Sequence, residues 1–198
     1  MMLIDKNKEY ESHGYRFKNF INLSERDILM ILDWRNHENV RRMMVNKDVI
    51  STEDHLRFVE TLKDRIDSYY WLVVNPQNRY IGVLDLIHVN EELDQGEIGY
   101  YLNQEELGAG FEFMIECLYF VFYHLKLGRN LVTVNVKNRD IVLFNMFIGT
   151  VFEEKKLIGD EEFYVSSNAN GDFIIEHYDE LTLSNYARFV KKNRGIII

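Results

Sequence analysis

Residues 96–110 read GEIGYYLNQEELGAG, a strand-like run followed by a turn that opens a long apolar helix over about 111–125. Gly108 and Gly110, separated by Ala109, allow a tight backbone turn that leaves N–H groups uncovered. These groups sit at the predicted N-terminus of the helix, where the helix dipole favours an anion such as a pyrophosphate. A loop that needs glycine only for a positive φ explains the same spacing equally well.

Outward from this stretch, strand and helix signals alternate along the whole chain. Strands are expected over 15–20, 69–74, 80–88, 96–102, 130–136, 150–157, 162–166 and 172–178, and helices after Ser24 and Ser51, over 111–125, after Asn138 and over 181–192. This order predicts one domain over residues 1–198, with its core at about 15–178. The expected fold is α/β of the α+β type, with a mixed, mostly antiparallel sheet of about seven strands flanked by helices.

Composition excludes several classes of protein. The 198 residues carry a net charge of −9, which disfavours sequence-independent binding to nucleic acid or to anionic lipid. Cys117 is the one cysteine and lies in an apolar run, so we expect a buried side chain rather than a nucleophile. The histidines are scattered without the spacing of metal ligands. Without an apolar signal core or membrane-length segment, we expect a cytoplasmic protein.

Several motifs together resemble one family. They are Trp34-Arg35-Asn36-His37, the helix with Ser51, Glu53, His55 and Phe58, the strand Ile81-Gly82-Val83-Leu84-Asp85, the Gly108–Gly110 turn, and Asn138 opening a helix after the next strand. In these residues the chain resembles the GCN5-related N-acetyltransferase (GNAT) superfamily. Within it, the sugar-nucleotide amine N-acetyltransferases of pseudaminic acid biosynthesis are the most similar group. The resemblance covers roughly residues 15–155. It implies the acyl-CoA N-acyltransferase fold, acetyl-CoA as co-substrate and no metal.

The resemblance also implies which residues contact the cofactor. The glycine-rich turn would hold the coenzyme A pyrophosphate, Asn138 the pantetheine arm, and position 144 the residue that protonates the departing thiolate. The implied contacts are Tyr101, Leu102, Leu107, Gly108, Ala109, Gly110, Asn138 and Phe144. Three residues depart from the family pattern: Leu107 replaces a polar or basic residue, Glu112 a small one, and Phe144 a tyrosine. Asn138 is equally well explained as a simple helix N-cap.

Catalytic and acceptor residues follow from the chemistry of amine acylation. A base must collect the amine proton, and Glu97, with Tyr100 close to it in sequence, is our candidate. The acceptor contacts implied by the resemblance are Arg35, Met44, His55 and Phe58, with Met43 as a further apolar wall. Each has a structural alternative: a solvated strand carboxylate, a surface ion pair, a partly buried helix histidine, or core packing.

Three hypotheses for function follow. The first is an acetyl-CoA-dependent N-acetyltransferase of a small amine such as a nucleotide-linked amino sugar, with a protein N-terminus or an amino acid as the alternative acceptor. The second is a catalytically degenerate binding module of the same fold. The third, a different nucleotide binder, is disfavoured because Gly-Ala-Gly lacks the third glycine of a dinucleotide fingerprint. We expect a small-molecule amine as partner, no nucleic acid and no membrane, and leave a homodimer open.

Overall fold

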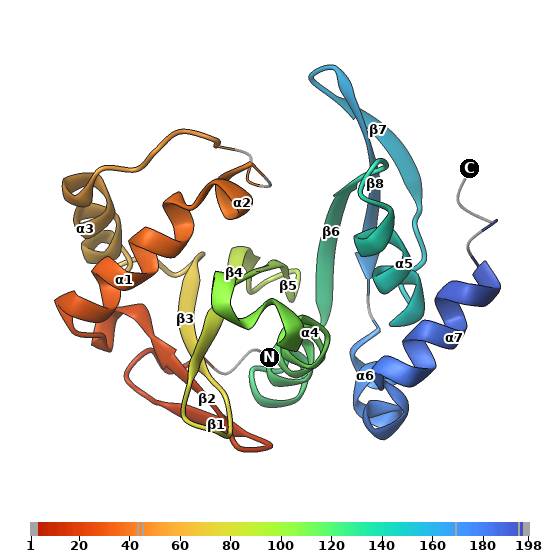
Figure 1. The fold of residues 1–198 in the computed structure, drawn as a ribbon, viewed down its shortest axis with the longest axis horizontal. Helices are drawn as coiled ribbons and strands as arrows, with labels where there is room; N and C mark the ends of the chain where they lie inside the picture. Colours follow the sequence, from red (N-terminus) through yellow and green to blue (C-terminus); the bar gives the residue numbers. More distant parts are fainter. Residues whose placement is uncertain (1–3, 43, 45, 169, 194, 196–198) are drawn as a thin grey trace. The chain divides into compact units, whose positions relative to one another are not determined.

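The chain folds into two compact units that share one strand. The computed structural model describes residues 4–42, 44, 46–168, 170–193 and 195 (Figure 1). The N-terminal unit comprises Ile4–Val89 and Gly99–Phe113, and the C-terminal unit comprises Asn90–Ile98 and the described residues from Met114 onward. Strand β5 contributes to both units, because the division falls between Ile98 and Gly99.

The sheet of the N-terminal unit has the order β1-β2-β3-β4-β5, and β1 to β4 pair antiparallel. Its centre is β3, whose sequence YYWLVV is almost wholly buried, as a run of aromatic and β-branched residues favours. The hairpin between β1 and β2 turns through His13 and Gly14, which both have positive φ. The strands are β1 (Tyr10–Ser12), β2 (Tyr15–Asn19), β3 (Tyr69–Val74), β4 (Tyr80–Asn90) and β5 (Gln95–Leu102).

Serine caps start the two longer helices of this unit, as the sequence predicted. Ser24 accepts a hydrogen bond from the backbone N–H of Asp27, and Ser51 accepts one from that of Asp54. Figure 1 shows α1 and α3 side by side, and their apolar faces pack into one core with Leu72 of β3. The helices are η1 (Phe20–Asn22), α1 (Glu25–Asn36), α2 (Glu38–Arg41) and α3 (Thr52–Thr61).

The sheet of the C-terminal unit has the order β5-β6-β8-β7. The first half of β5 runs parallel to β6, from the pair Gln95–Arg129 to the pair Glu97–Leu131. The other pairs are antiparallel, so the expected mixed, mostly antiparallel sheet is confirmed, with eight described strands rather than about seven. The further strands are β6 (Arg129–Asn135), β7 (Glu154–Ile158) and β8 (Glu161–Asn168).

The predicted helix over 111–125 is present, but its last turn changes type. It begins as α4 (Gly110–Tyr119) and continues as a π-helical turn, η3 (Phe120–His124). The remaining helices are α5 (Arg139–Phe147), α6 (Gly171–Glu176), η4 (Tyr178–Glu180) and α7 (Leu183–Asn193), and α7 packs against α5 (Figure 1). Among the described residues, no helix combines the length and apolar character that crossing a membrane requires.

The strand predicted over 172–178 is wrong, because this segment forms α6. A helix buries Gly171 and Ile174, three residues apart, and leaves Phe173 partly exposed. The ring of Phe122 stands against Gly171, where an added Cβ would lie 2.6 Å from its Cδ1 atom. Two other strands also differ from prediction. β7 begins at Glu154 rather than at residue 150, and β1 was not predicted at all.

Candidate functional site

A cluster of polar side chains lies in the N-terminal unit. Its members are Arg35 on α1, His55 on α3, Tyr70 on β3, Asp85 on β4 and Tyr101 on β5. The charge of Arg35 acts on the pKa values of His55 and of both tyrosines, and the carboxylate of Asp85 acts on both tyrosines. Five elements distant in sequence therefore bring these groups into one electrostatic environment.

The cluster keeps its histidine neutral and its phenols protonated. Burial is the main cause that lowers the pKa of His55; Arg35 lowers it further, and a backbone hydrogen bond with Ile28 opposes both. Burial, and then Asp85, raises the pKa values of Tyr70 and Tyr101. At neutral pH the imidazole can accept a proton, and the phenols can donate hydrogen bonds.

Arg35 and His55 each keep a buried nitrogen that has no hydrogen-bond partner among the described residues. These atoms are Nη1 of Arg35 and Nε2 of His55. The other terminal nitrogen of Arg35 donates to the carbonyl oxygen of Asn46 at 3.0 Å. An unpaired buried donor is costly unless a ligand or water completes it. The predicted contacts Arg35 and His55 are therefore placed together, with unused hydrogen-bonding capacity.

The segment after α2 is held beside Arg35 by polar contacts from α1 and α2. Asn36 binds Ile50 twice, through its side-chain nitrogen to the carbonyl oxygen at 2.8 Å and through its oxygen to the backbone N–H at 2.9 Å. Arg41 donates to the carbonyl oxygen of Lys47 at 2.7 Å, and its Nε is also buried without a partner among the described residues. Two guanidinium groups thus bind neighbouring carbonyl groups in a protein whose net charge is negative.

Aromatic side chains form an apolar wall beside His55. The ring of Phe58 stacks on His55 with centroids 6.3 Å apart and meets Tyr70 edge to face at 5.1 Å. The ring of Phe20 also contacts Tyr70, with centroids 5.5 Å apart. Met44 is partly buried, and Met43 lies outside the described residues. Phe58 therefore joins the predicted contact His55, while no described contact places Met44 there.

Two glycines let β4 and β5 come close beside the cluster. A Cβ added at Gly99 would lie 2.5 Å from Oδ1 of Asp85, and one added at Gly82 would overlap the carbonyl oxygen of Tyr101. Sequence reasoning assigned no role to Asp85 or Tyr70. The signal was a glycine on each of two consecutive strands, but which residues face them depends on strand register.

The glycine-rich segment differs from the predicted loop. Residues Gln104–Ala109, η2, form two short 3-10 helical turns joined by a kink at Glu106 (φ −114°, ψ 19°), and η2 runs directly into α4. Asn103 caps η2 by accepting a hydrogen bond from the N–H of Glu105 at 3.2 Å. Neither Gly108 nor Gly110 has a positive φ; Gly110 is helical, with φ −62° and ψ −37°. The alternative reading, a loop that needs glycine for a positive φ, is therefore wrong, whereas the predicted helix N-terminus is present at Gly110.

Space and charge around this segment are compatible with an anion. A Cβ added at Gly108 would have no heavy atom within 4 Å, so its surroundings are open. Glu106, one of the carboxylates that would repel a pyrophosphate, forms an ion pair with Arg79 at 2.9 Å. At Gly110 an added Cβ would lie 2.9 Å from Cδ1 of Leu102.

The remaining predicted residues have structural contacts of their own. Glu97, on the part of β5 in the C-terminal unit, is partly buried opposite Leu131. Asn138 caps α5 by accepting from the N–H of Ile141 at 3.5 Å. Tyr100, in the N-terminal unit, meets Phe113 edge to face at 6.2 Å.

Phe144 occupies the position where the family resemblance implies a tyrosine. Its side chain is 1% exposed and lies edge to face against Tyr186 of α7, with ring centroids 6.1 Å apart. The hydroxyl of Tyr186 donates to the carbonyl oxygen of Asp140 at 3.1 Å. Phe144 is therefore part of the packing between α5 and α7.

Cys117 is fully buried on α4, as expected. Within the described part of the chain, no group of three or more histidine, cysteine or acidic side chains could hold a metal ion.

Comparison with known proteins identifies the family. A family model described as the acetyltransferase (GNAT) domain matches residues 19–142. The chain therefore belongs to the GNAT family of N-acetyltransferases. Acetyltransferase PseH of Campylobacter jejuni subsp. jejuni serotype O:23/36 (strain 81-176) is 30% identical over 150 residues, covering 75% of this chain and 90% of PseH.

Solved structures show the same fold. Campylobacter jejuni PseH in complex with acetyl coenzyme A matches with a TM-score of 0.59 at 22% identity, covering 78% of this chain and 99% of PseH. Spermidine N-acetyltransferase from Vibrio cholerae, in complex with CoA and spermine, matches with a TM-score of 0.70 at 18% identity. The match covers 82% of this chain and 99% of that enzyme. The predicted acyl-CoA N-acyltransferase fold is therefore confirmed.

Proposed function

We propose that the chain transfers the acetyl group of acetyl-CoA to the amine of a nucleotide-linked amino sugar. Membership of the GNAT family supports N-acetylation, and the relative PseH has been crystallised with acetyl coenzyme A. The observation that carries the choice of acceptor is the buried, unpaired Nη1 of the partly exposed Arg35, in the same electrostatic environment as neutral His55. A guanidinium with a free edge suits a phosphate, which a nucleotide sugar supplies and a simple polyamine lacks.

Each acceptor residue has a proposed role. Arg35 binds a phosphate oxygen through Nη1, and His55 hydrogen-bonds the sugar through Nε2. Phe58 offers an apolar face to the sugar ring, and Met44 extends that face. These contacts would fix the amine relative to the thioester, which is the main contribution that positioning makes to such a reaction.

For acetyl-CoA, the proposed contacts are those predicted from the sequence. The start of α4, with Gly108, Ala109 and Gly110, would bind the pyrophosphate through backbone N–H groups; Tyr101, Leu102 and Leu107 would flank it. The open space at Gly108 and the pairing of Glu106 with Arg79 support this fit. Asn138 and Phe144 are proposed to line the pantetheine arm.

The reaction requires two proton movements. The neutral amine forms a C–N bond with the thioester carbonyl, the C–S bond breaks, and the thiolate leaves. Glu97 is our candidate to collect the amine proton, directly or through water. Phe144 has no proton to give, so the phenol of Tyr100 is our candidate to protonate the thiolate.

An acceptor panel tests the proposal. Purified protein is incubated with acetyl-CoA and a UDP-linked 4-amino sugar, spermidine, an amino acid or an N-terminal peptide, and thiol release is followed. We expect turnover with the UDP-linked sugar, and its loss in E97Q with substrate binding retained. Turnover with spermidine or the peptide alone would overturn the choice of acceptor.

A binding measurement separates a degenerate module from an enzyme. Acetyl-CoA that binds the native state raises the melting temperature in proportion to the logarithm of its concentration. We expect such a rise. No rise up to millimolar acetyl-CoA, with no turnover on any acceptor, would leave the fold as a binding module.

A further inference from the structure

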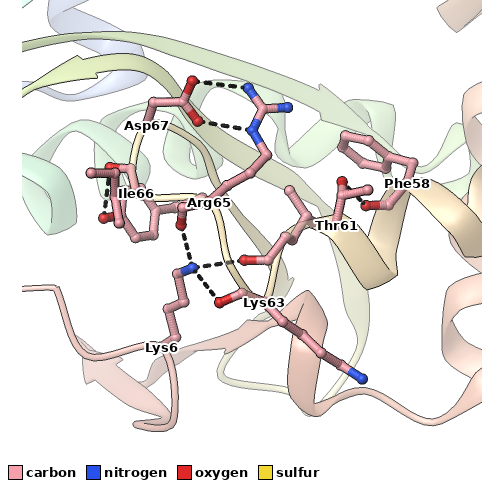
Figure 2. A network of polar contacts seen from close by, with 9 residues as sticks. Lys6, Phe58, Thr61, Lys63, Arg65, Ile66 and Asp67 are labelled. Atoms are coloured by element: carbon pink, nitrogen blue, oxygen red, sulfur yellow. Dashed lines mark hydrogen bonds and ion pairs between the residues drawn. The ribbon is translucent and has the colours of Figure 1, made fainter.

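Lys6 makes an unusual set of contacts at the end of α3. Its ammonium group donates to the carbonyl oxygens of Leu62 at 2.7 Å, Lys63 at 3.1 Å and Arg65 (Figure 2). An ammonium group has three protons, so these contacts use all of them. A residue near the N-terminus thus closes the junction between α3 and β3.

The contacts satisfy carbonyl groups just beyond the helix end, because the last carbonyl groups of α3 itself accept from the N–H groups of Leu62, Lys63 and Asp64. A cation at this end also interacts favourably with the helix dipole. α3 ends at Thr61, and Leu62 is its C-cap. Burial lowers the pKa of Lys6, while Asp64 and Asp67 counteract this and favour the charged form.

The rest of the junction is also restrained. Arg65 pairs with Asp67 through two nitrogens, at 2.8 Å and 3.1 Å, and this hydrogen bonding lowers the pKa of Asp67 to about 2 (Figure 2). Tyr69, the first residue of β3, donates its hydroxyl hydrogen to the carbonyl oxygen of Ile66 at 2.9 Å. Lys6 therefore completes a short, closely bonded connection.

The main chain of Lys6 is fixed as well. Its carbonyl oxygen accepts a hydrogen bond from the side-chain nitrogen of Asn22 at 2.6 Å. The preceding residue, Asp5, donates its backbone N–H to the hydroxyl of Tyr10 at 2.8 Å. Lys6 thus connects the segment just before α1 with the end of α3.

Phe58, a proposed acceptor contact, and Tyr70, which packs against it, lie on either side of this junction. Phe58 is four residues before Leu62 on α3, Tyr70 is the second residue of β3, and the two rings meet at 5.1 Å. Leu62, whose carbonyl group Lys6 binds, is 2% exposed and belongs to the core against which Phe58 and Tyr70 pack. Movement at the junction would therefore shift the wall beside His55.

We propose that Lys6 is a positioning residue for the acceptor, which sets the separation of α3 and β3 and with it the placement of His55, Phe58 and Tyr70. This inference rests on the proposed function, since it assumes that His55 and Phe58 contact the acceptor. Lys6 lies before residue 19, where the match to the GNAT domain begins.

The test compares three variants by steady-state kinetics with acetyl-CoA and a UDP-linked 4-amino sugar. K6M removes the charge and keeps the length, K6R keeps a cationic donor, and K8M alters an exposed lysine of the same segment that lies over the Tyr10 ring. We expect K6M to raise KM for the sugar about tenfold and to leave KM for acetyl-CoA and kcat within about twofold. K6R should restore part of the loss, and K8M should match the wild type.

Hydrogen exchange gives a second measurement that needs no acceptor. Amides of residues 60–67 should exchange faster in K6M than in the wild type and K8M, because the ammonium group that binds the carbonyl groups of the junction is lost. An equal change of both KM values, or unchanged kinetics despite faster exchange, would show a purely structural role and overturn the inference. A wild-type protein inactive on every acceptor, with normal exchange behaviour, would instead refute the proposed function.

Discussion

The two units differ in how they use their buried polar groups. In the N-terminal unit, Arg35 and His55 keep buried nitrogens without partners among the described residues. In the C-terminal unit, buried Glu116 accepts from the hydroxyl of Tyr178 at 2.6 Å, and Asn145 donates to the carbonyl oxygen of Ile141 at 2.9 Å. Buried side-chain atoms without a partner among the described residues lie mostly in the N-terminal unit, with Oδ1 of Asp94 as an exception in the C-terminal unit, which is why the proposed acceptor contacts are placed in the N-terminal unit.

The largest expected effect is a loss of stability in a variant that disturbs the close approach of β4 and β5 in the N-terminal unit. In G82A the new methyl group would overlap the carbonyl oxygen of Tyr101 and lie 2.9 Å from Cζ of Phe113. Overpacking of this kind lowers the free energy of unfolding by about 3 kcal/mol, which urea denaturation measures.

G108A is the matched control for G82A. Its methyl group would meet open space, so the free energy of unfolding should stay level or rise by about 0.5 kcal/mol. Equal losses in both variants would contradict the difference in packing between the two glycines.

Substitution of Arg35 tests the recognition chemistry directly. In R35M the free guanidinium edge is lost, and we expect kcat/KM for the UDP-linked sugar to fall about 100-fold. R57M is the control, because Arg57 lies on α3 in exposed ion pairs with Glu53 and Asp54. If both variants kept wild-type kinetics, Arg35 would have no part in binding the acceptor.

A variant at Phe144 tests the contrasting role of the C-terminal unit. F144Y adds a hydroxyl to a side chain that is 1% exposed, and a buried polar group without a partner costs about 1–3 kcal/mol of unfolding free energy. We expect lower stability and no gain in kcat. A clear rise in kcat would mean that position 144 reaches the departing thiolate after all.

The smallest effect expected is a pH dependence of stability from His55. The pKa of His55 is lowered in the folded state, mainly by burial, so the unfolded chain binds its proton first as the pH falls below the ordinary value of 6.5. Stability should therefore decrease from pH 7 to pH 5. H55Q should show a smaller decrease in parallel thermal melts, and identical slopes would exclude His55 as the cause.

Local signals predicted most of the fold. β3 was predicted with its observed bounds, because its run of large apolar residues needs burial on both faces, and Ser24 and Ser51 cap their helices as expected. The segment 172–178 was mistaken for a strand, because its β-branched residues suit both structures and the contact of Gly171 with Phe122 decides between them.

The site was less predictable, because it depends on register and on distant contacts. Arg35, His55 and Phe58 were named from family motifs, but the placing of Asp85 against Gly99 requires the pairing of β4 with β5. The alternative reading of Gly108 and Gly110, a loop with positive φ, is wrong, because glycine permits such a backbone without requiring it. Lys6 binds carbonyl groups that lie 56 to 59 positions further along the chain, and no local pattern in the sequence predicts contacts of this range.

Strand β5 makes the two units inseparable as pieces of chain. The backbone leaves the N-terminal unit after Val89, returns at Gly99 and leaves again after Phe113, so no single cut releases either unit whole. A chimera that took its N-terminal unit from a relative would need a junction inside β5, between Ile98 and Gly99. It would also need junctions after Val89 and after Phe113. New acceptor preferences in this protein are therefore more readily acquired by point substitution than by recombination.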